Sequence, residues 1–206
     1  MIVGLVNIGI GNLHSITKFL DHKDTKYILI NNEKEFEKCD KIIIPGQGAF
    51  NFSIKQIENS FLKDSIINHI LKKKYILGIC LGMQLFMEKS FENEISNGLG
   101  LIKGNVIKIN MNYKIKPIPH MGWNKIFSHS TSNVNKLFQN VLENNYFYFA
   151  HSYFCDLKLN QHCMITNYEN LEFTSFYFKE NIIGTQFHPE LSGENGYKFL
   201  TCFLKL

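Results

Sequence analysis

The stretch Tyr75-Ile76-Leu77-Gly78-Ile79-Cys80-Leu81-Gly82 (residues 75–82) carries the pattern from which the fold can be predicted. A short apolar run, of the kind that forms a buried parallel strand, leads directly into a cysteine that stands between two glycines. Glycine on either side leaves room for a sharp strand-to-helix turn that lifts a nucleophile onto the edge of a sheet. The stretch therefore predicts a strand over residues 75–79, a following helix, and Cys80 on the turn between them.

Strands and helices alternate on the N-terminal side of this stretch. Apolar and β-branched runs predict strands over residues 2–6, 27–30 and 41–44. A helix is expected after Asn12, a typical N-cap, a weak helical turn around Phe36, and one long helix over residues 54–71. Such alternation predicts βαβ units around a mostly parallel sheet, with the loops 7–12, 45–50 and 78–82 at one edge.

The C-terminal half has a different pattern. Strand-like runs occur at residues 104–109, 145–150, 172–178 and 182–187, and one strong helix is expected over residues 197–204. Hairpins in this half are expected to extend the sheet. With 206 residues, close to the size of one domain, we predict a single domain over residues 1–206. Its expected fold is an α/β three-layer sandwich, with a mostly parallel sheet extended by antiparallel strands.

Composition excludes several classes of function. All 22 basic residues are lysine and the formal net charge is +4. Without arginine, sequence-specific recognition of nucleic acid is not expected. The apolar N-terminus has no basic residues before it and ends long before the length of a membrane span, so no signal segment and no membrane partner are predicted.

The five cysteines are odd in number and include no C-x-x-C pair. This spacing favours neither a disulfide framework nor a zinc site, and it fits a reducing, cytoplasmic setting. We predict no metal and no cofactor. The cysteines are Cys39, Cys80, Cys155, Cys163 and Cys202.

Cys80, His188 and Glu190 are the candidate catalytic residues. A helix N-terminus after Cys80 favours the thiolate, the nucleophilic form of cysteine. His188 follows an expected strand directly, and Glu190, two residues later, can orient its imidazole ring and stabilise the cation. The alternatives are a buried cysteine in a glycine-rich turn and a plain surface turn at His188-Pro189-Glu190.

An oxyanion site is expected at Pro45-Gly46-Gln47-Gly48, which follows another strand at the same edge. Two glycines allow backbone N–H groups to approach a developing negative charge closely. A simple Pro-Gly turn is the alternative for this stretch.

Together these motifs resemble the class I (triad) glutamine amidotransferases, and more narrowly the glutaminase subunits of imidazole glycerol phosphate synthase. The resemblance covers nearly the whole chain. The cysteine and His-Pro-Glu stretches mark the class, and a stretch around Trp123 marks the narrower family. The matching stretches are Gly11-Asn12-Leu13-His14-Ser15, residues 45–50, residues 78–86, Pro119-His120-Met121-Gly122-Trp123-Asn124, His151-Ser152-Tyr153 and residues 186–190.

The resemblance implies a specific reaction. Cys80 would attack the side-chain amide of glutamine, His188 would protonate the leaving ammonia, and the resulting γ-glutamyl thioester would be hydrolysed. Glu190 would orient His188. The resemblance also implies an oxyanion site formed by Gly46, Gly48 and Leu81, and a glutamine site formed by Gln84, His151, Ser152 and Tyr153. For His151, a packed histidine at a strand end is the alternative.

The resemblance further implies a partner. Ammonia released into water at neutral pH becomes protonated and is no longer a nucleophile, so the chain would dock as a heterodimer onto a cyclase or synthase subunit, a HisF-like barrel. That partner would make imidazole glycerol phosphate and aminoimidazole carboxamide ribotide in histidine biosynthesis. A lone tryptophan such as Trp123 would otherwise be assigned to the core. The implied contact residues are Asn12, Met121, Trp123 and Asn124.

The sequence departs from the family pattern in three places: Asn7-Ile8 in place of Asp-Tyr, Gln47 in place of Val, and Leu191 in place of Lys. None of them removes a member of the triad, but they leave the identity of the partner open. One alternative is a related glutaminase that feeds ammonia to a different synthase, such as a surface-sugar amidotransferase. The others are a non-catalytic regulatory module and a stand-alone cysteine hydrolase.

Overall fold

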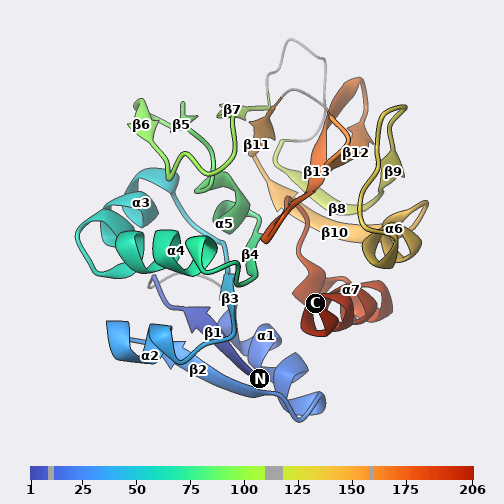
Figure 1. Ribbon diagram of the computed structural model, residues 1–206. Helices are drawn as coiled ribbons and strands as arrows, with labels where there is room; N and C mark the ends of the chain where they lie inside the picture. Colours follow the sequence, from blue (N-terminus) through green and yellow to red (C-terminus); the bar gives the residue numbers. More distant parts are fainter. Residues whose placement is uncertain (9–11, 110–117, 158–159) are drawn as a thin grey trace.

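A computed structural model describes residues 1–8, 12–109, 118–157 and 160–206 (Figure 1). The helices are α1 (Leu13–His22), α2 (Glu33–Glu37), α3 (Phe50–Glu58), α4 (Leu62–Leu71), α5 (Leu81–Gln84), α6 (Lys136–Leu142) and α7 (Gly193–Lys205). The strands are β1 (Ile2–Val6), β2 (Lys26–Ile30), β3 (Lys41–Ile44), β4 (Ile76–Ile79), β5 (Lys89–Ser90), β6 (Ser96–Asn97), β7 (Asn105–Lys108), β8 (His120–Lys125), β9 (Phe127–Ser128), β10 (Tyr146–His151), β11 (Tyr153–Asp156), β12 (Cys163–Tyr168), β13 (Leu171–Lys179) and β14 (Ile182–Thr185).

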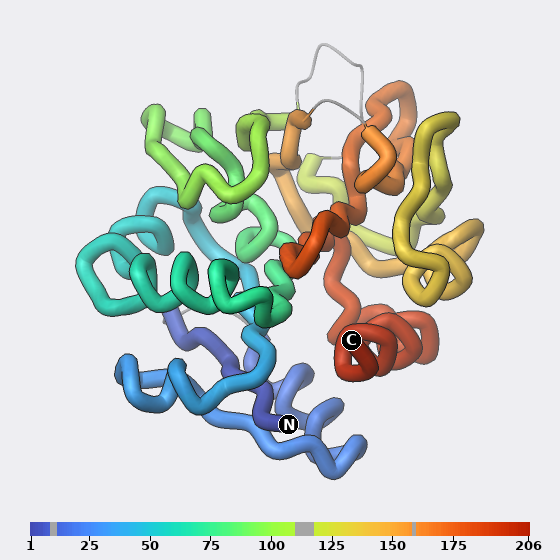
Figure 2. The backbone as a smooth tube through the Cα atoms, in the orientation of Figure 1, coloured from blue at the N-terminus to red at the C-terminus, as the bar shows by residue number. Residues whose placement is uncertain are grey.

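The central sheet has eight strands in the order β2-β1-β3-β4-β14-β13-β12-β9. The first five strands of this order run parallel, and β13, β12 and β9 extend the sheet with antiparallel pairings. The predicted α/β fold with an antiparallel extension is therefore confirmed. In the backbone trace, the green segment with β4 and the orange-red segment with β14 meet near the middle of the molecule (Figure 2).

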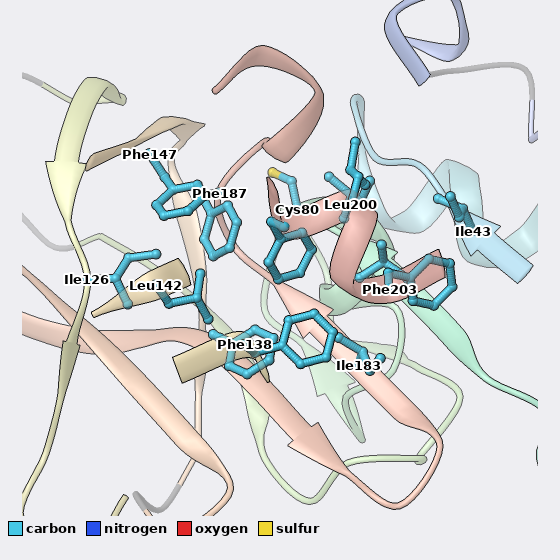
Figure 3. Close-up of a cluster of buried hydrophobic side chains, with 14 of the residues drawn as sticks. Ile43, Cys80, Ile126, Phe138, Leu142, Phe147, Ile183, Phe187, Leu200 and Phe203 are labelled. Atoms are coloured by element: carbon cyan, nitrogen blue, oxygen red, sulfur yellow. The ribbon is translucent and has the colours of Figure 1, made fainter. Parts of the chain in front are cut away.

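Helices cover both faces of this sheet, so the central strands are buried on both sides. Leu5 and Ile43 point into a core shared with α1, α6 and α7, whereas Val6 and Ile42 point into a core shared with α2, α3 and α4. Alternation along a strand sends successive side chains to opposite faces. Figure 3 shows part of the first core, with Cys80 among its members.

The single helix predicted over residues 54–71 is wrong, since two helices, α3 and α4, occupy this region. Ser60 interrupts the helical hydrogen bonding. Its hydroxyl donates to the Ile57 carbonyl and accepts from the Leu62 N–H at 3.3 Å. Serine side chains compete with helical backbone bonds in this way.

The C-terminal half departs further from the expectation. Residues 105–108 and 146–151 do form strands, but β7 joins a four-stranded sheet, β11-β7-β5-β6, and β10 pairs only with β8. Neither extends the central sheet. The strands β8, β11 and β12 and the helix α6 had no counterpart in the prediction. Within the described ranges, every helix is too short or too polar to cross a membrane.

Candidate active site

Cys80 occupies a sharp turn between β4 and α5. Its backbone has φ +51° and ψ −104°, a conformation that costs energy for any residue with a side chain. The helix that follows has only four residues, so the turn itself, more than a long helix, defines the local geometry. The expected strand, turn and helix are present, and the cysteine is buried with 6% of its surface exposed.

Two glycines allow the neighbouring backbone to approach this turn. A Cβ on Gly82 would lie 2.1 Å from the Ile44 carbonyl oxygen, and a Cβ on Gly46 would lie 2.4 Å from the Leu81 nitrogen. Both contacts are with backbone atoms, which cannot move aside as the end of a side chain can. The Pro45 to Gly48 turn after β3 is therefore packed directly against the Cys80 turn, and Gly48 itself has φ +107°.

His188 and Glu190 reach Cys80 from the adjacent strand. β14 pairs in parallel with β4, and the Cys80 N–H donates to the Thr185 carbonyl at 2.6 Å. The chain beyond Thr185 thus leaves the sheet beside the cysteine. His188 Nδ1 lies 2.8 Å from Glu190 Oε1, and the ring is close enough to Cys80 for the sulfur to affect the pKa of His188. Both side chains of the His–Glu pair are at least 97% buried.

The charges of this group favour an imidazolium ion. Burial by itself lowers the pKa of His188, but the Cys80 thiolate and then the Glu190 carboxylate outweigh it and raise that pKa to about 11. Protonated His188 therefore lies beside the Cys80 sulfur in a buried pair. Such a pair holds both a nucleophile and a proton donor ready at neutral pH.

A cavity of about 250 Å³ opens beside the sulfur. His188 and Glu190 are not among the residues that line it. Its walls include Cys80 and every residue predicted to bind substrate or oxyanion, namely Gly46, Gly48, Leu81, Gln84, His151, Ser152 and Tyr153.

Two further residues, one in the cavity wall and one beside the Cys80 sulfur, were missed by the sequence analysis. Glu92 lines the cavity, and its Oε2 accepts from the Phe50 N–H at 2.9 Å. Its carboxylate is suited to an ammonium group. Gln186, fully buried, points its Nε2 at Cys80 Sγ at 3.4 Å. Glu92 belongs to no recognisable motif, whereas Gln186 stands in the quoted 186–190 stretch and could have been considered.

Gln84 and His151 are already engaged in internal hydrogen bonds. Gln84 Nε2 donates to the Tyr153 carbonyl at 2.9 Å and to Gln186 Oε1 at 3.3 Å. His151 contacts the same carbonyl and the His120 ring. Burial, with the neighbouring His120, lowers the pKa of His151 to about 3, so its ring is neutral. This agrees with the alternative of a packed histidine at a strand end.

The residues expected at a partner contact lie mostly on β8. Met121 is 61% exposed and Trp123 is 55% exposed, so assigning Trp123 to the core is wrong. Asn124 donates to the Asn167 carbonyl, and Asn12 caps α1 by accepting from the Ser15 N–H. Gly11, in the quoted 11–15 stretch, lies outside the described residues. In the portion of the chain with described coordinates, no group of three or more potential metal ligands occurs.

Comparison with known proteins gives consistent matches over the whole chain. The family model described as glutamine amidotransferase class-I matches residues 5–205. The chain is 40% identical to the imidazole glycerol phosphate synthase subunit HisH of Methanocaldococcus jannaschii, covering 99% of each chain. It is also 40% identical to the HisH subunit of Pyrococcus furiosus, covering 99% of this chain and 98% of the other.

Similarity to solved structures supports the fold alone. A chain in the structure of PurLQS from Thermotoga maritima superposes with a TM-score of 0.73 at 18% identity, covering 99% of this chain and 97% of that one. A crystal structure of a glutamine amidotransferase superposes with a TM-score of 0.72 at 14% identity, covering 98% of this chain and 97% of that one.

Proposed function

Because the chain belongs to the class I glutamine amidotransferases, and within them to the HisH subunits of imidazole glycerol phosphate synthase, we propose that Cys80, His188 and Glu190 are its catalytic triad. The observation that carries this proposal is the buried Cys80–His188–Glu190 contact at the margin of a cavity. Hydrolysis of glutamine to glutamate and ammonia is the reaction that these residues perform.

Each step of that reaction has a group to perform it. The Cys80 thiolate attacks the side-chain carbonyl carbon of glutamine, and the carbonyl electrons move to oxygen. Backbone N–H groups at Leu81 and around Gly46 and Gly48 stabilise this oxyanion. As the intermediate collapses, the C–N bond breaks and the nitrogen takes the proton of His188, which releases ammonia and leaves a γ-glutamyl thioester.

Hydrolysis of the thioester uses the same groups, with water in the place that ammonia left. Neutral His188 accepts a proton from water as the water oxygen attacks the thioester carbon. The C–S bond then breaks, which releases glutamate and restores the thiolate–imidazolium pair. Glu190 holds the ring in the orientation that both proton transfers need, and its charge stabilises the imidazolium.

The cavity is suited to one free amino acid. About 250 Å³ is room for a small ligand, and Glu92 supplies a negative charge for an α-ammonium group. Ser152 and Tyr153 also line the cavity, and Gln84 and His151 in the same lining are bound to the Tyr153 carbonyl. These residues therefore select glutamine by its charged end, and the turn at Gly46 and Gly48 receives its amide.

The proposal includes a partner and a place of action. The ammonia passes to a cyclase subunit, a HisF-like barrel that docks as a heterodimer and makes imidazole glycerol phosphate and aminoimidazole carboxamide ribotide in histidine biosynthesis. The exposed Met121 and Trp123 support docking through β8, which also contains Asn124. Asn12 is proposed as a further contact residue. Five free cysteines fit the reducing cytoplasm. The match over residues 5–205 supports one glutaminase domain.

The decisive test separates glutamine-dependent from ammonia-dependent synthesis by the complex. Cys80→Ala is expected to abolish synthesis with glutamine and to leave synthesis with added ammonium salt intact. Cys202→Ala, which removes a buried thiol from α7, is the matched control and retains both. The proposal is contradicted if Cys80→Ala loses both activities or if it retains synthesis with glutamine.

Three alternatives give different results in related assays. A glutamine-like electrophile that fails to label Cys80 even in the complex would indicate a non-catalytic module. Full glutamine turnover by the lone chain would indicate a stand-alone hydrolase. Co-purification of a sugar-modifying synthase in place of the cyclase would indicate a related pathway.

A further inference from the structure

The backbone carbonyl of Tyr153 is the branch point of a buried hydrogen-bonded chain. Gln84 Nε2 donates to this oxygen at 2.9 Å, and His151 Nδ1 lies at the same distance from it. A carbonyl oxygen can only accept, and it has two lone pairs. Both of its partners must therefore present N–H groups, which fixes the orientation of the Gln84 amide and the tautomer of His151.

One arm leads from this carbonyl to the sulfur of Cys80. The second N–H of Gln84 Nε2 points at Gln186 Oε1 at 3.3 Å. The Gln186 amide must then turn its nitrogen the other way, and Nε2 lies 3.4 Å from Cys80 Sγ. Because each orientation follows from the one before it, an N–H group necessarily faces the sulfur.

The other arm leads to β8. With its proton on Nδ1, His151 has a lone pair on Nε2, so the His120 Nδ1 at 3.0 Å must be the donor. The His120 ring is stacked on Tyr168 at 3.9 Å between centroids and on Phe149 at 4.8 Å. His120 is the first residue of β8, next to the exposed Met121.

We propose that Gln186 is a positioning residue for the Cys80 thiolate, held in its donor orientation by the buried chain that ends at His120. The inference rests on the proposed function, since it gives Cys80 the role of nucleophile. An N–H group aimed at sulfur stabilises the anion, which accepts hydrogen bonds more strongly than the thiol. It also restrains the sulfur on the side of the cavity.

The donor-to-acceptor direction of these hydrogen bonds makes the proposal specific. If the Tyr153 carbonyl lost its donors, the amides of Gln84 and Gln186 could turn over, and an oxygen would face the anionic sulfur. Packing would hardly change in that case, but the thiolate would meet a repulsive dipole. The chain therefore acts through the direction of its hydrogen bonds.

Gln186→Leu and Gln186→Glu test the arm that reaches the sulfur. Neither side chain presents an N–H group, and the carboxylate of the second also repels the thiolate. Alkylation of Cys80 by iodoacetamide at pH 7, read by mass spectrometry of the Cys80 peptide, is expected to slow by about tenfold or more, the factor that a hydrogen bond to a charged group represents. kcat for glutamine should fall by a similar factor with KM little changed, because Gln186 does not line the cavity.

Gln139→Leu is the matched control for these variants. Gln139 is partly buried and donates through Nε2 to Ser128 in β9, the end strand of the central sheet, and it lines no part of the Cys80 cavity. Its alkylation rate and kcat are expected to equal those of the wild-type chain. If Gln186→Leu folds, by its thermal unfolding midpoint, and alkylates at the wild-type rate, the proposal is wrong.

Two substitutions of His120 separate hydrogen bonding from packing. His120→Phe keeps a ring for the stack on Tyr168 and Phe149 but removes the donor to His151. His120→Asn loses the ring and retains an N–H close to the position of Nδ1. We expect kcat to fall roughly threefold or more in His120→Phe and to fall less in His120→Asn. His69→Asn, at a buried histidine that contacts the Tyr75 carbonyl, controls for the loss of a buried ring.

The outcomes distinguish this inference from the proposed function. A wild-type complex that neither hydrolyses glutamine nor is labelled at Cys80 refutes the proposed function. An active wild-type complex whose His120→Asn variant is more impaired than His120→Phe refutes the hydrogen-bonded chain, because packing would then be what His120 supplies.

Discussion

Replacing Glu190 with glutamine tests the charge on the catalytic histidine while keeping the shape of the side chain. His188 Nδ1 and Glu190 Oε1 are 2.8 Å apart and both side chains are at least 97% buried, so solvent screens the interaction little. A hydrogen bond between charged groups contributes about 1.5–3 kcal/mol and a neutral one about 0.5–1.5 kcal/mol. The glutamine oxygen can still accept from Nδ1, so the loss is the difference between the two, about 1–1.5 kcal/mol.

That difference corresponds to roughly a tenfold decrease in kcat, at about 1.4 kcal/mol for each factor of ten. KM is expected to stay the same because Glu190 does not line the cavity. The assay is steady-state release of glutamate by the complex over a range of glutamine concentrations. Glu194→Gln is the matched control, since Glu194 is 81% exposed and pairs with Lys198 at the surface. A wild-type kcat in Glu190→Gln, or a change confined to KM, would refute the assigned role.

Three further predictions concern stability and docking. Gly82→Ala should lower the free energy of unfolding by about 3 kcal/mol and abolish glutaminase activity, because its Cβ would meet a backbone oxygen at 2.1 Å. The control is Gly4→Ala, whose Cβ meets only the ends of side chains. Urea titration should show a smaller loss of unfolding free energy for this variant. Burial lowers the pKa of His69 and of His120 from 6.5 to about 4, so the unfolded chain binds more protons below pH 6.5 and stability should fall by about 1 kcal/mol per pH unit per histidine as the pH drops. Urea titrations at pH 7, 6 and 5 measure this change of unfolding free energy with pH, which His69→Asn should reduce. The same slope in His69→Asn as in the wild-type chain contradicts the prediction. Trp123→Ala should weaken capture of the cyclase subunit and leave the unfolding midpoint within a few degrees, whereas an unfolded variant would show that Trp123 supports the fold.

The sequence was sufficient to predict the site wherever a motif follows a strand. Cys80 follows β4 and the Gly46 turn follows β3, and the carboxyl ends of adjacent parallel strands necessarily meet at one edge. The helical and strand periods of the first half are local properties, so they could be recognised without tertiary information. The break between α3 and α4 depends on a single serine hydroxyl and was not visible in the apolar pattern.

The second half was harder to predict because its strands lack regular alternation. β8 has the sequence His-Met-Gly-Trp-Asn-Lys, with Met121 and Trp123 exposed and His120 buried on the opposite face. That arrangement is the reverse of an apolar face turned inward, so the pattern gave no strand. The pairing of β8 with β10, and hence the place of His120, depends on contacts between distant segments. Gln186 and Cys80 are likewise 106 residues apart in the chain, and nothing in either local sequence shows that they touch.

The strained turn at Cys80 is maintained by the same contacts that assemble the site. A residue with positive φ costs on the order of 1–3 kcal/mol and persists only where its surroundings prevent relaxation. Here β3 packs against the turn through Gly82, and β14 holds it through the Cys80–Thr185 hydrogen bond. The first of these neighbours leads into the oxyanion turn and the second leads into His188. Relaxing the backbone of Cys80 would therefore require both flanking strands to move, and each movement would also displace one part of the catalytic machinery. For this reason we expect substitutions at the turn to reduce stability and activity together, whereas substitutions at Glu190 reduce activity with a smaller loss of stability.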